Sequence, residues 1–297
     1  MASGVARGGG GGVAAEQARA EPPRVKVIRP PTFSPTGLLR GLALLADYAD
    51  LLRTLSLHRI KVRYKQSALG LAWALLQPLS LMLIYTLVFS VITKMPSDGA
   101  PYAVFAYAAL LPWTFFSTAL TNATNGLVSH AHLVTKVYFP REILPLSYVI
   151  AALFDLLTAS SVLFALMFYY RVPLTWNALW AVPVVFVLTA FLTAMSLLLS
   201  ATQVRFRDIG MAMPLLLQLW MFATPVVYPL EQVPQRFRGL YVLNPMVGVV
   251  EGFRRAVVLG EAPDLRLLAL SAAVSLVLLP AAYVYFKRIE ATVADVI

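Results

Sequence analysis

Long apolar runs separated by short polar segments dominate the chain after residue 65. A helix that crosses the hydrocarbon core of a bilayer needs about 20 mostly apolar residues. Six runs of suitable length and low charge occur, near residues 69–92, 103–125, 144–170, 178–201, 209–229 and 266–286. The pattern therefore predicts an all-α integral membrane protein with six transmembrane helices, formed by residues 67–297.

An amphipathic pattern precedes the first apolar run. Between Leu42 and Leu57, leucines and Tyr48 recur mostly at three- or four-residue spacing, and Asp and Arg fill many of the other positions. This segment is too charged to span a membrane, and its pattern is typical of a helix that lies in the interface. We expect such an interface helix, which would serve as a gate, within residues 39–66.

Four cations end this segment at every second residue: Arg59, Lys61, Arg63 and Lys65. Period-two alternation is the pattern of a half-buried strand, but an isolated strand beside lipid would leave backbone groups unpaired. We therefore favour a helix. Because residues of an α-helix advance by about 100° each, Arg59 and Arg63 would share one side, and Lys61 and Lys65 the other.

Residues 1–38 differ in composition from the rest of the chain. They contain the run Gly8–Gly12 and several prolines, a composition that does not bury a core and predicts a disordered tail. The glycine run lacks the Lys-Ser/Thr that follows the glycines of a phosphate-binding loop.

Residues 230–264, between the last two apolar runs, are too many for a simple turn. Within them, Val247–Val258 has a helical apolar pattern that is broken by Glu251, Arg254 and Arg255. We expect a short helical hairpin here, either re-entrant or lying on the surface. The pattern leaves open whether it is an outer lid or only a structured loop.

Composition and charge support the membrane assignment and orient the chain. Hydrophobic residues make up 59% of the 297 residues and charged residues only 13%, whereas charged residues form about a quarter of soluble domains. With the N-terminus inside, most of the 24 Lys and Arg residues fall in the inside segments. The positive-inside rule then predicts that both termini are cytoplasmic.

Few side chains offer chemistry. The absence of cysteine excludes disulfides and thiolate sites, and His130 and His132 lack a nearby carboxylate to complete a metal site. Asp155 is the one charge deep in an apolar run, which makes it a functional candidate. We favour a structural role for it, through Thr158, Ser161 or a partner subunit. No nucleotide-binding motif occurs, so uphill transport would draw energy from an ion gradient or another polypeptide.

Several separated segments carry a family resemblance that extends from about Arg40 to the C-terminus. They are KVRYKQSALGLAWALLQPL (Lys61–Leu79), KVYFPREILPLS (Lys136–Ser147), QVRFRDI (Gln203–Ile209), ATPVVYPLEQVP (Ala223–Pro234), LNPMVGVVEGFRRAVV (Leu243–Val258) and FKRIEATVADVI (Phe286–Ile297). In this order they resemble ABC-2 type permeases that export polysaccharides such as O-antigen, capsule, teichoic acid or galactan.

The resemblance implies a homodimer of six-span subunits in a bacterial inner membrane, paired with two copies of a separate ATPase. ATP and Mg would bind to that ATPase, and this chain would bind no cofactor, metal or nucleic acid and carry no catalytic residue. The substrate would be an undecaprenyl-diphosphate-linked glycan.

Residues 126–142 would form the segment that couples this chain to the ATPase. Pro140 stops the preceding helix and sets a turn, which gives a compact knob with mixed charges and one aromatic anchor, Phe139. The expected coupling residues are Lys136, Tyr138, Phe139, Pro140, Arg141 and Glu142.

Three further groups are expected to meet the substrate. The cytoplasmic gate for the diphosphate or lipid headgroup would be Arg53, Arg59, Lys61, Arg63, Tyr64 and Lys65, because arginine forks and lysine point charges bind phosphates. The aromatic lining of a glycan channel would be Trp73, Tyr85, Trp113, Phe115 and Phe116. The outer gate would be Asn244, Glu251, Arg254 and Arg255.

Other functions remain to be weighed against this one. The gate cations also suit simple anchoring to anionic headgroups, at about 1 kcal/mol per cation. A gradient-driven transporter would show more intramembrane charges than Asp155, and a membrane glycosyltransferase would cluster acids or histidines at one face. An ABC-2 exporter of another lipid or of a drug is the main alternative.

Overall fold

The computed structural model describes residues 45–65 and 72–296, which lie in the compact unit Pro31–Ile297. The expected tail, residues 1–38, falls outside the described residues, as do the first residues of both the interface helix and the first span. The side chains of Tyr64 and of residues 291–296 are also outside the description. In the described ranges, all regular secondary structure is helical, which confirms the all-α prediction.

Residues 59–65 are the last two turns of an α-helix, α2 (Ala49–Lys65). The helical interpretation of the alternating cations is therefore confirmed and the strand pattern was misleading. Helix α2 packs against α6 (Ile143–Tyr169). Its half-buried leucines join a hydrophobic cluster with the end of α11 (Leu265–Val296).

Five helices are long and apolar enough to cross a membrane, among the described residues. They are α3 (Ala72–Tyr85) with its π-helical continuation η2 (Thr86–Ile92), α4 (Tyr102–Ser129), α6, the 3-10 helix η3 (Trp176–Trp180) with α7 (Ala181–Arg205), and α11. Each corresponds to one expected span.

The remaining expected span, residues 209–229, is not a helix of that length. It corresponds to α8 (Asp208–Phe222), which has 15 residues. Pro225 follows shortly, and because the residue before a proline is disfavoured in the α conformation, the helix ends and the chain turns. The six-span count is therefore not confirmed: the described residues contain five long helices and one short apolar helix.

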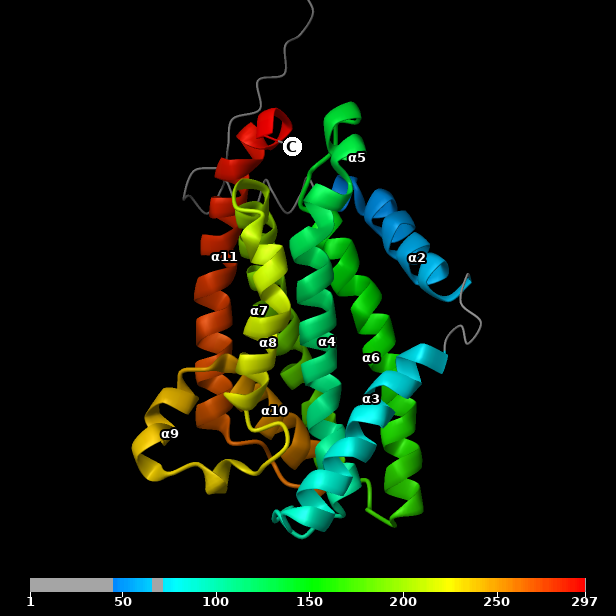
Figure 1. Cartoon of the computed structure of the whole chain (residues 1–297), viewed down its shortest axis with the longest axis vertical. Coiled ribbons are helices and arrows are strands. Elements are labelled where there is room, and N and C mark those ends of the chain that lie inside the picture. The colour runs from blue at the N-terminus through cyan, green and yellow to red at the C-terminus, as the bar shows by residue number, and fades with distance from the viewer. Residues whose placement is uncertain (1–44, 66–71, 297) are drawn as a thin grey trace, which may run out of the picture. The chain divides into compact units, whose positions relative to one another are not determined.

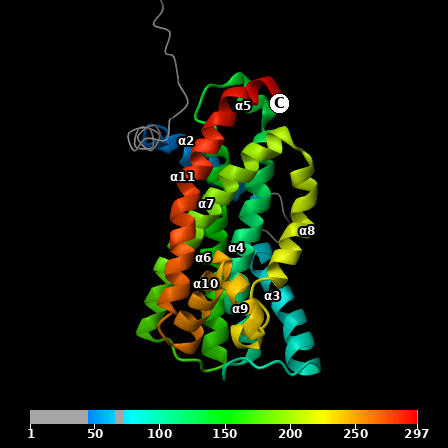
Figure 2. The same cartoon turned by 90° about the vertical axis from the view of Figure 1, so that its left-hand side faces the viewer.

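Helix α4 lies at the centre of the packing. It contacts α3, α6, α7, α8 and the buried helix α10 (Pro245–Arg254), and it is the most deeply buried of the five candidate spans. In Figures 1 and 2, α5 (Ala131–Lys136) and the last turns of α11 lie at one end of the long helices, and α9 and α10 lie at the other.

The region expected to form a helical hairpin does contain helices. These are the 3-10 turn η4 (Leu230–Gln232), α9 (Gln235–Val242), α10 and the π-helical η5 (Arg255–Leu259). Helix α9 is mostly exposed, whereas every residue of α10 is buried against α4, α7 and α11.

Candidate functional site

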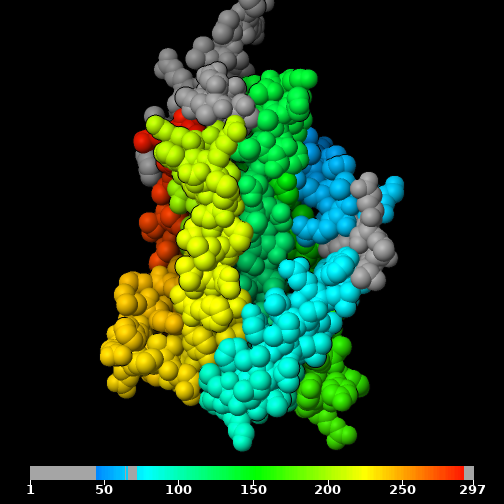
Figure 3. All heavy atoms as spheres, viewed as in Figure 1, coloured from blue at the N-terminus to red at the C-terminus, as the bar shows by residue number. Residues whose placement is uncertain are grey.

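A stripe of polar side chains runs along the otherwise buried α4. It consists of Thr114, Ser117, Thr118, Thr121 and Asn122, all half-buried. These positions recur at i, i+3, i+4, i+7 and i+8, so they share one face of the helix. Figure 3 shows that α4 reaches the surface between α8 and α3. We call these five residues the α4 polar stripe.

Two adjoining cavities are built on this stripe. The first has a volume of about 320 Å³ and is lined by Gln77 and four residues of the α4 polar stripe. The second has a volume of about 280 Å³ and extends between α3, α4 and α6 to the end of α2. Gln77 and Thr118 line both cavities, which therefore form one groove. Its part beside the α4 polar stripe is polar, whereas apolar side chains predominate in the second cavity.

An ion pair lies at the end of the groove. Arg63 donates to Asp155 Oδ2, and both residues line the second cavity. Of the local hydroxyls expected near Asp155, Thr158 Oγ1 donates to the Phe154 carbonyl at 2.9 Å and Ser161 Oγ to the Thr158 carbonyl at 2.7 Å. Arg63 is thus a partner of Asp155 that the sequence did not suggest, and contact with a partner subunit stays a prediction.

Arg59 also contacts α6, one turn before Arg63. Its Nε donates to Ser147 Oγ at 2.7 Å, and its guanidinium lies 3.4 Å from the centroid of the Tyr148 ring. Burial lowers the pKa of the Arg59 guanidinium, and Tyr148 opposes this shift. The prediction that Arg59 and Arg63 share one side of a helix is confirmed.

The other expected gate residues do not share these contacts. Arg53, Lys61 and Lys65 are exposed, as is Arg63 in spite of its ion pair with Asp155. The side chain of Tyr64 lies outside the described residues. The expected gate is therefore divided into two arginines that hold α2 on α6 and three cations that face outward.

The aromatic residues expected to line a channel also fall into two sets: some line the second cavity, and the others pack inside the protein. Trp73, which is 54% exposed, and Phe115 line the second cavity. Phe116 is fully buried, stacked on Phe191 with ring centroids 5.6 Å apart and met edge-on by Trp220. Trp113 is buried beside Phe116. Tyr85 is half-buried, and its hydroxyl donates to Met221 Sδ at 3.7 Å.

The expected coupling segment exposes fewer residues than its sequence suggested. Tyr138 is 72% exposed and Lys136 is exposed, but Phe139 and Pro140 are buried. Phe139 packs with Leu127 and other apolar side chains. Phe139 was predicted as the aromatic anchor for a partner, and this is corrected: the exposed aromatic ring of the segment is that of Tyr138.

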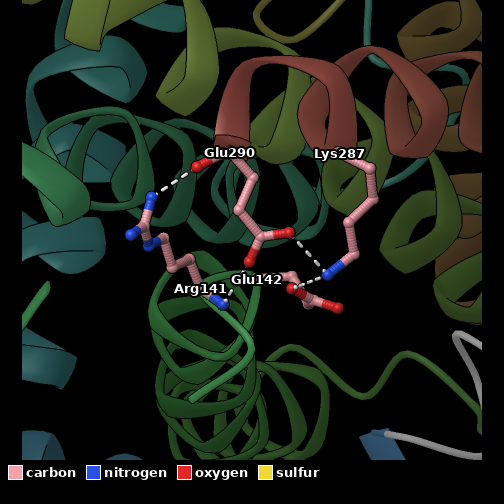
Figure 4. A network of polar contacts seen from close by, with 4 residues as sticks. All are labelled: Arg141, Glu142, Lys287 and Glu290. Atoms are coloured by element: carbon pink, nitrogen blue, oxygen red, sulfur yellow. Dashed lines mark hydrogen bonds and ion pairs between the residues drawn. The ribbon is translucent and has the colours of Figure 1, made fainter. Parts of the chain in front are cut away.

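Arg141 and Glu142 are engaged with the last turns of α11 (Figure 4). Lys287 Nζ lies 2.7 Å from Glu142 Oε2 and 2.7 Å from Glu290 Oε2. The Arg141 backbone N–H donates to Glu290 Oε1 at 3.0 Å, and its guanidinium donates to the Glu290 carbonyl. Burial raises the pKa of the Glu142 carboxyl, Glu290 adds to this rise, and Lys287 opposes it. These two expected docking residues thus make internal contacts.

Of the expected outer-gate residues, Glu251 and Arg254 are buried, whereas Asn244 and Arg255 are half-buried. Arg254 is fully buried, pairs with Glu251, donates to the Pro225 carbonyl at 3.1 Å and lies over the Phe105 ring. Arg255 pairs with Glu261 at 2.7 Å.

Asn244 joins the end of α8 to the start of α10. Its Oδ1 accepts from Trp220 Nε1 at 3.0 Å and from the Met246 backbone N–H at 3.1 Å. Its Nδ2 donates to Thr224 Oγ1 at 3.0 Å. It therefore satisfies backbone and side-chain groups at both helix ends, as an N-cap residue does.

Gln203 is a connecting residue that the sequence did not single out. Its Oε1 accepts from the Gly210 backbone N–H at 2.6 Å, and its Nε2 donates to Asn125 Oδ1 at 3.3 Å. It thereby ties α7, α8 and α4 together. A Cβ at Gly210 would lie 2.6 Å from the side chains of both Gln203 and Asn125. The sequence feature that could have indicated this close packing is the glycine itself, two residues after an Arg-Asp pair.

No group of three His, Cys, Asp or Glu side chains arranged like metal ligands occurs within residues 45–65 and 72–296.

Comparisons with known proteins identify a family. A match to the family described as ABC-2 type transporter covers residues 50–258. The O-antigen export system permease protein RfbA of Myxococcus xanthus is 34% identical over 252 residues, which cover 84% of this chain and 96% of that protein. RfbA of Klebsiella pneumoniae is 29% identical, over 69% of this chain and 79% of its own length. The polysialic acid transport protein KpsM of Escherichia coli is 26% identical, over 75% and 88%.

Proposed function

The chain belongs to the ABC-2 type transporter family, and from this premise we propose that it is the permease subunit of an ATP-driven polysaccharide exporter. Its substrate would be a glycan linked to undecaprenyl diphosphate, moved across the inner membrane of a bacterium. The permeases that it resembles are named for O-antigen export and polysialic acid transport, which supports a polymer of sugars as the cargo.

The polar groove beside α4 is the observation that carries this proposal. Sugars present hydroxyl groups that both donate and accept hydrogen bonds, and a purely apolar path would leave them without partners. The α4 polar stripe and Gln77 supply hydroxyl and amide groups along the most buried helix of the protein. Trp73 adds a half-exposed ring for the apolar face of a sugar.

A second copy of the chain would close this groove. The helices on either side of α4 expose apolar residues, including Leu83, Leu87 and Val91 on α3 and η2 and Leu215 and Leu219 on α8. Exposed apolar strips that flank a polar groove suit a symmetric dimer in which two α4 polar stripes face each other. Such a homodimer would enclose a path with polar walls.

The end of the molecule that carries α5 would face the cytoplasm, together with both termini. Two copies of a separate ATPase would then dock on the coupling segment, where Lys136 and Tyr138 are exposed. This chain would bind no nucleotide itself, and ATP and Mg would bind in the ATPase. The helices α9 and α10 would lie at the outer side and form the outer gate.

The exposed cations Arg53, Lys61 and Lys65 would receive the diphosphate or lipid headgroup at the cytoplasmic side. Binding of a diphosphate by Arg63 would replace the ion pair of Arg63 with Asp155. Arg59 already contacts Tyr148 and Ser147. Anchoring to anionic lipids uses the same outward-facing cations and accompanies this role.

The test is export by cells in which the gene is deleted and then restored. Surface polysaccharide should disappear on deletion and return with the wild-type gene and with Thr158→Leu, which places leucine outside the groove. Thr118→Leu with Thr121→Leu fills the groove with apolar side chains and should reduce surface polysaccharide strongly without lowering the amount of protein in the membrane.

Normal surface polysaccharide in the deletion strain would contradict the proposal. It would then favour the other member of the same class, an exporter of a smaller lipid or a drug. Export in the absence of any ATPase partner would contradict the ABC mechanism itself and favour a gradient-driven transporter.

A further inference from the structure

The coupling segment is joined to α11 through a compact polar network, which we call the α11 joint: Arg141, Glu142, Lys287 and Glu290 (Figure 4). Lys287 bridges the two carboxylates at 2.7 Å each. Arg141 contacts Glu290 through both its backbone N–H and its guanidinium. Apart from the Lys287–Glu290 pair, which lies within α11, these contacts cross from the segment before α6 to the end of α11, 145 residues or more away in the sequence.

The Glu142–Lys287 pair at the centre of the joint is buried, and Arg141 and Glu290 are half-buried. Glu142 is completely buried, and the Lys287 side chain is only 9% exposed. Phe139, Ile143 and Phe286 surround it in one apolar cluster. Separating a buried ion pair leaves an uncompensated charge in a medium of low polarity, so the two sides of the joint move together rather than slide apart.

The other end of α11 is attached to α10 just as closely. Ser271 Oγ donates to the Pro245 carbonyl at 2.9 Å, and Gly248 approaches α11 so closely that a Cβ would lie 2.6 Å from the Leu267 carbonyl oxygen. Helix α11 has 32 residues, which at about 1.5 Å per residue is roughly 48 Å. One continuous helix thus connects the coupling segment with the buried helix at the opposite end (Figure 1).

We propose that Lys287 and Glu290 are positioning residues that pass the movement of the coupling segment to α11 and, through it, to α10. This inference rests on the proposed function, because it takes the coupling segment to be the place where the ATPase pushes. The receiving element is α11, not only α6, which continues directly from the segment.

Hydrogen exchange in the assembled complex tests the route. The full-length permease and its ATPase would be reconstituted in lipid nanodiscs, with and without ATP and vanadate. In the wild type, nucleotide should change amide exchange both at residues 131–140 and at residues 245–259. In Lys287→Met the change at 131–140 should persist, while the change at 245–259 should fall by about fivefold or more, the size of a typical coupling between sites.

Matched variants distinguish a loss of the transmitted nucleotide response from a loss of protein stability. Lys287→Arg can still bridge both carboxylates and should keep the response at 245–259. Arg288→Met makes the same type of change at the next residue, which is exposed, and should behave like the wild type. Arg141→Ala leaves the buried pair in place and should give a partial loss, so it replaces Lys287→Met if that variant does not assemble.

The readouts also distinguish the two proposals. ATP hydrolysis should remain close to the wild-type rate in Lys287→Met while surface polysaccharide falls, which is the signature of uncoupling. If Lys287→Met or Arg141→Ala keeps the full nucleotide response at 245–259, the α11 joint does not transmit and the inference is wrong, even though the exporter assignment stands. If the wild-type chain neither binds an ATPase nor supports surface polysaccharide, the proposed function itself fails.

Discussion

The side chains of Arg59 and Arg63 lie one turn apart on α2 and contact different residues of α6. The helical period in the sequence predicted their common side, because spacing along a helix depends only on local geometry. It contained no sign of their partners Ser147, Tyr148 and Asp155, which lie about 90 residues further along the chain. The Thr158 and Ser161 hydroxyls expected near Asp155 donate to backbone carbonyls, as Thr and Ser hydroxyls in a helix readily do.

The Arg63–Asp155 pair should show a measurable coupling between its two side chains. In a double-mutant cycle with Arg63→Gln and Asp155→Asn, we expect an interaction free energy of about 1 kcal/mol, because Arg63 is partly exposed and solvent screens the pair. The measurement is unfolding of the purified protein in detergent micelles. Lys61→Gln, at an exposed position, should be additive with Asp155→Asn. Equal additivity for Arg63→Gln would contradict the pairing.

Most of the helices were predictable from the sequence, and α8 is the exception. Five expected spans became long helices because their apolar runs exceed the length that a bilayer requires. The run at 209–229 is equally apolar but contains Pro225 and Pro229, so α8 stops at Phe222. Hydropathy alone does not register this, because proline acts on backbone geometry rather than on polarity. The sequence likewise did not indicate that the charged residues of α10, Glu251 and Arg254, are buried.

Helix α10 should not tolerate a side chain at Gly248. An added Cβ would meet Ser271 Oγ and the backbone of Leu267 on α11, so we expect Gly248→Ala to lower the free energy of unfolding by about 1–3 kcal/mol, as overpacking does. The thermal unfolding midpoint of the purified protein measures this. Gly239→Ala is the control, because a Cβ on Gly239 in α9 meets nothing within 4 Å. Equal midpoints for the two variants would refute close packing of α10 on α11.

At the scale of the whole chain, the sequence predicted the class of protein and the order of its segments, but not which helix lies innermost. Helix α4 is less apolar than the other candidate spans and yet the most buried, because its polar residues are confined to one face. The candidate site was predicted in fragments: Arg63 was assigned to the gate and Trp73 and Phe115 to the channel, and the structure brings the three to one cavity. Long-range packing decides this, and the local pattern does not encode it.

Docking of the ATPase should depend on Tyr138. This ring is the exposed aromatic of the coupling segment, and exposed aromatics that become buried often dominate an interface. We expect Tyr138→Ala to weaken binding of the ATPase at least about tenfold, or about 1.4 kcal/mol, in co-purification and titration with the purified partner. Trp176→Ala changes an even more exposed ring at the opposite end of the molecule and should bind normally. Retention of full affinity by Tyr138→Ala would place the contact elsewhere.

The hydroxyl groups of the α4 polar stripe donate to their own helix: Thr121 Oγ1 to the Ser117 carbonyl at 2.8 Å and Thr114 Oγ1 to the Leu111 carbonyl at 3.1 Å. Their oxygen atoms keep lone pairs that point away from the backbone, and they repeat about every 5 Å along the axis. Such a surface offers many weak, interchangeable acceptors and no pocket that fits one particular sugar. A chain of sugars lying on it could advance by exchanging a hydrogen bond to one acceptor for a similar bond to the next. The energy barrier to each such step would be small. Selectivity among glycans would then have to arise at the ends of the polymer, where the lipid and the first sugars are recognised, and not along its length.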